Sequence, residues 1–228
     1  MPGTDGTPRA GPGLAALAAV AAAIWLAFDA SGLDMAVSRV FFDAASGTFL
    51  LRDNWWLAAA GHTGLKRLSV AFWCLLAFGA AWVPARWAAL QPALREAAIS
   101  VAAAALLVLW LRGLSAHSCP WDVAGLGGSA QHYPLFGSLP ENPGPGACLP
   151  AAHASSGFAL FGLYFALREC HPKAARAVLA AAWALGLVAG AVQIARGAHF
   201  ASHVMWTAWI AWTSSRAMHI AASRLRGG

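Results

Sequence analysis

Long apolar runs are the feature that most constrains how this chain can fold. They number six and lie near residues 13–30, 69–84, 97–113, 151–168, 175–195 and 200–219. A helix needs about 20 apolar residues to cross the hydrocarbon of a bilayer, so runs of this kind favour membrane helices. The chain is 59% hydrophobic and only 11% charged, whereas a soluble domain carries about 25% charge. These observations predict an all-α integral membrane protein, a bundle of six transmembrane helices.

The remaining segments complete the predicted organisation. Residues 1–12 are rich in glycine and proline, which is typical of a disordered tail. Residues 13–68 are expected to hold the first transmembrane helix, an uncleaved anchor rather than a signal peptide, and then an amphipathic segment along the membrane interface. The helical bundle is predicted over 69–219, and a basic cytoplasmic tail over 220–228.

The basic residues predict which helix ends face the cytoplasm. If the N-terminus is inside, most Lys and Arg residues fall in short cytoplasmic segments, as the positive-inside rule requires. Both termini are then cytoplasmic. The long loop 114–150 and the junction 196–203 share the outer, periplasmic face of a bacterial-type inner membrane. The net charge of +6 follows from this topology, so we expect a bilayer as partner and no nucleic acid.

Imidazole and guanidinium groups gather at this predicted outer rim, which suggests an active site there. The residues are Arg112, His153, Arg196, His199 and His203. Arginines can hold an oxyanion through charge-assisted hydrogen bonds, and imidazoles can act as nucleophile or as general acid and base. Such a set has the groups that phosphoryl transfer without a metal requires.

Three segments of the chain carry a family resemblance through their order and spacing. They are RGLSAHSCP from Arg112 to Pro120, PAAH from Pro150 to His153, and QIARGAHFASH from Gln193 to His203. Together they resemble the motifs KxxxxxxRP, PSGH and SRxxxxxHxxxD of the type 2 phosphatidic acid phosphatase superfamily, which includes lipid phosphate phosphatases and vanadium haloperoxidase-like proteins. The resemblance covers about residues 100–210 and the six-helix layout.

The chain departs from the family pattern at several motif positions. Arg112 replaces the usual Lys, and the other replacements are Cys119 for Arg, Ala151 for Ser, Ala152 for Gly, Gln193 for Arg and His203 for Asp. These replacements leave fewer side chains to bind the phosphate. They leave open an altered substrate choice or a catalytically silent member that binds phospholipid or scaffolds other membrane proteins.

The resemblance implies a role for each matching residue. His199 would be the nucleophile that forms a phosphohistidine, and His153 would protonate the leaving oxygen. Arg112, Arg196 and the backbone amide of Ala152 would hold the phosphoryl oxygens. His203 would accept a hydrogen bond from the ring of His199.

The implied reaction is hydrolysis of a lipid phosphate without a metal or other cofactor. Substrates of the family include phosphatidic acid, phosphatidylglycerol phosphate, polyprenyl diphosphate and lipid A phosphates, and a lipid-to-lipid phosphotransferase would have the same sequence pattern. Asp122 could supply the missing carboxylate, and Ser155 a supporting hydroxyl. The spacing of His199 and His203 also suits a metal on a helix, with a third ligand from His153 or Asp122.

The cysteines and the loop histidines complete the predictions. Cys119 and Cys148 could form a disulfide if the loop faces an oxidising compartment, whereas Cys74 and Cys170 are expected to be inert core residues. Two further histidines, His117 and His132, are expected to be solvated. The Gly/Pro-rich part of the loop 114–150 is expected to be either a lid over the site or a simple connection between two helices.

Overall fold

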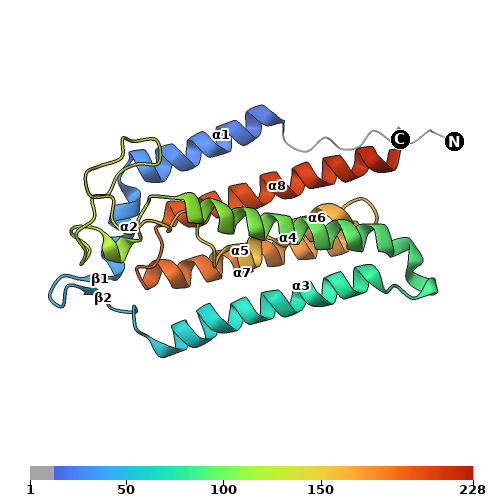
Figure 1. Cartoon of the computed structure of the whole chain (residues 1–228), viewed down its shortest axis with the longest axis horizontal. Coiled ribbons are helices and arrows are strands. Elements are labelled where there is room, and N and C mark those ends of the chain that lie inside the picture. The colour runs from blue at the N-terminus through green and yellow to red at the C-terminus, as the bar shows by residue number, and fades with distance from the viewer. Residues whose placement is uncertain (1–12, 228) are drawn as a thin grey trace.

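The computed structural model describes residues 13–227 and is built mainly of helices that run side by side (Figure 1). The predicted tail 1–12 lies outside the described residues. The longer helices are α1 (Leu14–Ile24), α3 (Leu65–Ala81), α4 (Gln91–Leu114), α7 (Pro172–Ala195) and α8 (Ala201–Gly227). The shorter helical segments are η1 (Trp25–Ala30), α2 (Leu33–Phe41), η2 (Leu57–Gly64), η3 (Ala85–Leu90), η4 (Pro120–Asp122), α5 (Ser155–Phe158) and α6 (Phe161–Leu167). Each predicted apolar run therefore corresponds to helix.

The membrane character of the chain is supported by two or three of these helices. The helices Ala85–Leu114 and Pro172–Ala195 are each long and apolar enough to cross a membrane. A third candidate is the pair Leu14–Ala30 and Leu33–Phe41, which is bent by 59°. The bend falls at Gly32, whose φ of +76° is readily adopted only by glycine. Crossing by all six runs stays a prediction.

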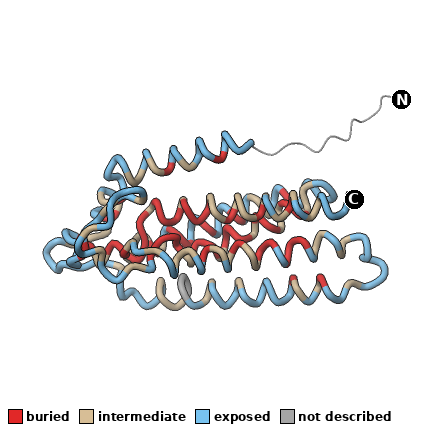
Figure 2. Tube along the Cα trace, turned by 45° about the horizontal axis from the view of Figure 1, so that its top comes forward, coloured by how far each residue is buried: buried red, intermediate tan, exposed pale blue. Residues whose placement is uncertain are grey.

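The core of the bundle lies around α5 and α6. Phe158, Phe161 and Phe165 are fully buried there. Their rings make edge contacts with Trp183 of α7 and Trp212 of α8, at centroid distances of 4.9 to 5.5 Å. Aromatic pairs of this geometry contribute about 0.5–1.5 kcal/mol beyond their buried area. The buried positions concentrate in the middle of the bundle, and α1 and α3 are mostly exposed (Figure 2).

The basic segment 220–228, predicted as a tail, is helical through Gly227 as the end of α8. Its Arg226 donates to the carboxylate of Glu96 in α4 at 2.6 Å, and Nδ1 of His219 lies 2.6 Å from the other oxygen of that carboxylate. These contacts tie the last turns of α8 to the beginning of α4.

The opposite end of the bundle is covered by irregular chain and by a small hairpin, which the all-α prediction did not include. Strands β1 (Phe42–Asp43) and β2 (Thr48–Phe49) pair antiparallel, with Phe42 opposite Phe49. Phe49 packs with Val123, Leu126 and Phe200 in a small apolar cluster separate from the main core. This cluster lies beneath the loop 114–150 and next to the junction between α7 and α8.

Candidate functional site

The junction between α7 and α8 is shaped by a glycine. Gly197 has a φ of +76°, its N–H donates to Ile194 O, and the next N–H, of Ala198, donates to Gln193 O. This pair of bonds is the Schellman arrangement, which ends a helix where a residue adopts the left-handed conformation. A Cβ at Gly197 would also collide with the ring of Phe49. The chain therefore turns sharply here, and His199 is placed between the two helices.

The beginning of α8 is held by contacts from two distant segments. Asp34 of α2 is buried, and its Oδ1 accepts a hydrogen bond of 2.9 Å from the backbone N–H of Ser202. Ala151 N donates to the carbonyl of His203, and the hydroxyl of Thr207 contacts the carbonyls of both Ala151 and His203. The second and third motif segments are therefore joined directly through their backbones.

Cys119 and Cys148 form the disulfide that their positions in the sequence allowed, with Cα atoms 5.3 Å apart. The bridge links the end of the first motif segment to the residues just before the second. The other prediction about cysteines is wrong, because Cys74 and Cys170 are exposed on their helices rather than buried in the core.

The ring of His199 lies at the centre of the three motif segments and is 3% exposed. Its centroid is 6.2 Å from that of His153 and 5.9 Å from that of His203. Burial lowers the pKa of His199 to about 3, and the nearby charges of His153 and Arg112 act in the same direction. The ring is therefore neutral at physiological pH, as a nucleophile must be.

A cavity of about 470 Å³ opens beside this group, between α3, α4 and the beginning of α5. Four of the predicted site residues line it: Arg112, Ala152, His153 and Ser155. The Ser155 hydroxyl donates to the carbonyl of Ala152 at 2.6 Å, so it fixes the turn that carries His153. His199 does not line this cavity, and its ring is next to that of His153, which does.

Two predicted residues are placed elsewhere. The guanidinium of Arg196 donates from Nε to the carbonyl of Arg52 at 3.1 Å and lies 3.5 Å from Oε1 of Gln193, and it does not line the cavity. Asp122 does not line it either, and its backbone carbonyl accepts a hydrogen bond from Ala130. Neither residue is therefore among those that line the cavity with Arg112 and His153.

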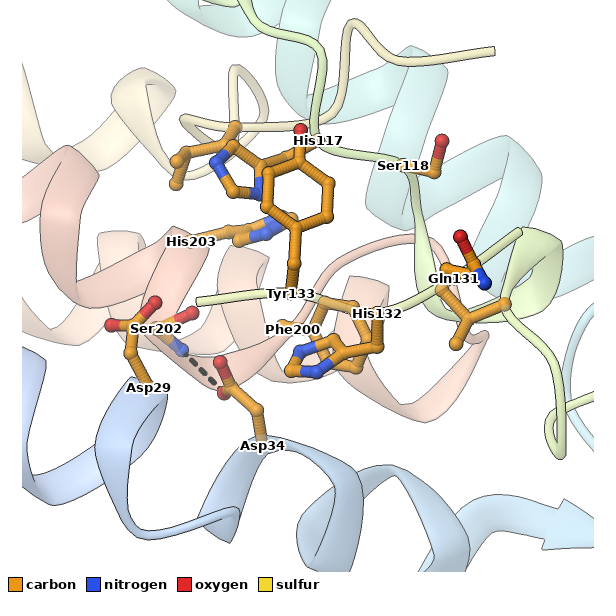
Figure 3. A pocket seen from close by; sticks show the side chains of 12 residues that line it. Asp29, Asp34, His117, Ser118, Gln131, His132, Tyr133, Phe200, Ser202 and His203 are labelled. Carbon is orange, nitrogen blue, oxygen red and sulfur yellow. Dashed lines mark hydrogen bonds between the residues drawn. The ribbon is translucent and has the colours of Figure 1, made fainter. Parts of the chain in front are cut away.

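His203 faces a different cavity, a small one of about 10 Å³ that His199 does not line (Figure 3). That volume suits about one water molecule. Other titratable side chains around it are Asp29, Asp34, His117, His132 and Tyr133. The carboxylates near His203 therefore come from α2 and the segment before it, not from Asp122.

Of the two loop histidines at this polar cavity, His117 is half-buried, which is less solvated than expected, whereas His132 is exposed. The ring of His117 stacks on Tyr133 at 4.3 Å, and the ring of His132 meets Phe200 edge-on at 5.0 Å. Burial lowers the pKa of both imidazoles. The loop that carries them therefore contacts Phe200, directly before α8, and lines the polar cavity together with His203.

Sequence reasoning missed several residues of the site. Lys66, in the segment predicted to lie along the membrane interface, lines the larger cavity together with Ser69 and Ser156. Asp34 was missed because a single carboxylate in an amphipathic segment carries no signal of its distant partner. Cys148 was considered only as half of a disulfide, although its sulfur lies 3.4 Å from Nδ1 of His199.

Comparison of the chain with protein-family models, curated proteins and solved structures finds no match.

Proposed function

We propose that this protein is a membrane phosphatase that removes a phosphate group from an amphiphilic lipid without a metal. The observation that carries the proposal is the larger cavity. Its polar end holds Arg112, His153 and Lys66, and the rest of its lining is largely apolar, with Phe72, Leu106 and other side chains of α3 and α4. A cavity with cationic groups at one end and apolar walls suits a molecule with a phosphate head and a hydrocarbon tail.

The apolar path continues beyond this cavity. Trp73, Ala102 and Leu106 also line a second, more open cavity of about 660 Å³ further along α3 and α4. The helical rise from Lys66 to Ala81 is about 22 Å at 1.5 Å per residue. This length suits a long acyl or prenyl chain, which supports a lipid rather than a small soluble phosphate ester as the substrate.

The neutral imidazole of His199 is the proposed nucleophile. Its Nδ1 lies against Cys148, so the lone pair of Nε2 attacks phosphorus while the ester P–O bond breaks. The phosphate must enter between Arg112 and His153 to reach this ring. The guanidinium of Arg112 stabilises the charge on the phosphoryl oxygens, and protonated His153 gives its proton to the leaving oxygen. Water then attacks the phosphohistidine, releases phosphate and restores the imidazole.

The proposed setting is a bacterial-type inner membrane crossed six times. Both helix ends that flank the long outer loop, the end of α4 and the beginning of α5, lie at the end of the bundle that carries the hairpin (Figure 1). Helix α8 runs from that end to the other end of the bundle, and the start of α1 lies beside α8, where the indole N–H of Trp209 donates to the carbonyl of Leu17. A disulfide between Cys119 and Cys148 favours an oxidising compartment for the site. We therefore place the site on the periplasmic face and the termini in the cytoplasm.

Phosphate release by the purified protein tests the proposal. Detergent micelles would carry phosphatidic acid, phosphatidylglycerol phosphate, a polyprenyl diphosphate or lipid A, each with a chelator present. We expect release from at least one of them, lost in His199→Gln and strongly reduced in His153→Gln. His171→Gln is the matched control, because His171 is an exposed histidine at the beginning of α7.

The alternatives give different results in the same experiment. A silent lipid-binding member would release no phosphate from any of the four lipids and would bind them equally well after His199→Gln. A phosphotransferase would release little phosphate until a second lipid with a free hydroxyl is added, and the phosphate would then appear on that lipid. Activity that the chelator abolishes would contradict the mechanism without a metal.

A further inference from the structure

Cys148 is the closest side chain to Nδ1 of His199 for which the structure gives a distance. The side chain of Cys148 is fully buried, its Sγ lies 3.4 Å from that nitrogen, and its backbone also hydrogen-bonds with the imidazole. The same sulfur lies 3.1 Å from the carbonyl oxygen of Ala198. Sγ of Cys119 and Sγ of Cys148 both lie within 4.8 Å of a ring nitrogen of His199. The disulfide is therefore part of the immediate surroundings of the ring.

These contacts favour one tautomer of His199. A disulfide sulfur and a backbone carbonyl can accept a hydrogen bond but cannot donate one. The sulfur lies against Nδ1, so the proton of the neutral ring is favoured on that nitrogen, and the lone pair of Nε2 is left for chemistry.

His203 does not take the position that the resemblance gave it. The rings of His199 and His203 meet edge to face at a centroid distance of 5.9 Å, and no hydrogen bond between them is present among residues 13–227. His203 instead lines the polar cavity with Asp34. The predicted acceptor for the nucleophilic ring is thus replaced by Cys148.

We infer that the bridge between Cys119 and Cys148 is a positioning element for His199 and that catalysis depends on the oxidised state of this pair. The inference rests on the proposed function, in which Nε2 of His199 attacks the substrate. Cys148 acts through His199 and does not touch the phosphate.

Reduction would weaken the preference for this tautomer. A dithiol reductant supplies two electrons and two protons, the S–S bond breaks, two thiols form, and the dithiol becomes a disulfide. The thiol of Cys148 can then donate a hydrogen to Nδ1, which favours the tautomer with the proton on Nε2. That tautomer has no lone pair on Nε2 for attack on phosphorus.

The experiment compares oxidised, reduced and reoxidised protein in a Cys74→Ser/Cys170→Ser background, so that only the bridge reacts. Thiol counting confirms each state. We expect kcat to fall about 10- to 100-fold on reduction, as the loss of a ring-orienting partner often causes, with KM little changed and full recovery on reoxidation. Cys119→Ala/Cys148→Ala, which removes both sulfurs, is the control that should not respond to the reductant.

A second readout does not need activity. Nitrogen-15 NMR of histidine-labelled protein, with the His199 signals assigned through His199→Gln, reports the tautomer directly. We expect the proton on Nδ1 in the oxidised protein and a shift of the proton toward Nε2 after reduction. If the bridge were purely structural, its reduction would lower the melting temperature and leave the tautomer unchanged. An unchanged tautomer in protein whose thiols are fully reduced would overturn the inference. Absence of phosphate release from the oxidised protein would reject the proposed function instead.

Discussion

The imidazole rings of His153 and His199 lie 6.2 Å apart between centroids, although one belongs to the turn before α5 and the other to the loop between α7 and α8. The contact depends on bonds that join the two segments, of which the hydrogen bond from Ala151 N to the carbonyl of His203 is the most direct. The proposed proton donor and the proposed nucleophile therefore come from separate segments that the fold brings together.

The two motif arginines should differ in their effect on activity. Arg112→Gln should lower kcat/KM about 100-fold or more, because loss of one donor to a developing oxyanion typically costs 10²–10³. Arg196→Gln should change it only a few-fold, because the guanidinium of Arg196 already donates to the carbonyl of Arg52. Phosphate release by the two variants, measured on the same lipid, checks this order. A larger loss in Arg196→Gln would contradict the placement of the phosphate.

Filling the apolar cavity should separate lipid substrates from soluble ones. Ala102→Trp places a large ring where the two cavities between α3 and α4 meet, so hydrolysis of a long-chain lipid phosphate should fall strongly. Hydrolysis of a small aryl phosphate, which needs only the polar end, should persist. Leu187→Trp is the control, because Leu187 is 44% exposed on α7. Equal loss on both substrates would argue against a path for the lipid tail.

Substitution of Asp34 should show how α8 is held at its beginning. Asp34→Ala removes the acceptor for the N–H of Ser202, and loss of a helix cap costs about 1 kcal/mol. Asp34→Asn keeps an acceptor oxygen and should lose less. Thermal unfolding followed by circular dichroism measures both variants. If Asn and Ala were equally destabilising, the charge of the carboxylate would matter more than the hydrogen bond.

Stability should decrease as the pH falls, because neutral imidazoles are buried. Burial lowers the pKa of His117, His132 and His199, the last to about 3, whereas an unfolded histidine titrates near about 6.5. Between these values the unfolded chain binds more protons. The stabilising contribution of His199 is therefore complete above about pH 6.5 and is lost progressively as the pH falls toward 3.

Melting temperatures between pH 8 and pH 4 test this pH dependence. The decline should be less steep in His199→Gln, which cannot take up the proton, than in the control His171→Gln. A decline that is equally steep in the two variants would assign the effect to other groups.

The apolar runs were enough to predict the helices, because a run of this length has few other ways to satisfy its backbone. The end of α8 extends further than its hydropathy indicated, since Arg226 is held by Glu96 of α4. The hairpin at Phe42 and Phe49 was missed because its strands are only two residues long, too short to show alternation.

The site was predicted in part. Order and spacing of the motifs predicted that Arg112, His153 and His199 meet, because each lies at the end of an apolar run on the same predicted face. The partners of Arg196 and His203 could not be predicted in this way. They depend on the backbone carbonyl of Arg52 and on the carboxylate of Asp34, and neither group belongs to a recognisable pattern.

Helix α3 contacts α4 more than it contacts any other helix, and the indole N–H of Trp73 donates to the carbonyl of Ala98 across that seam. An element attached along one edge can swing outward while the remaining helices stay packed. A lipid would then enter the cavity laterally from the bilayer, between α3 and α4, and its product would leave by the same route without passing through water. The interface between α3 and α4 would act as a lateral gate to the bilayer.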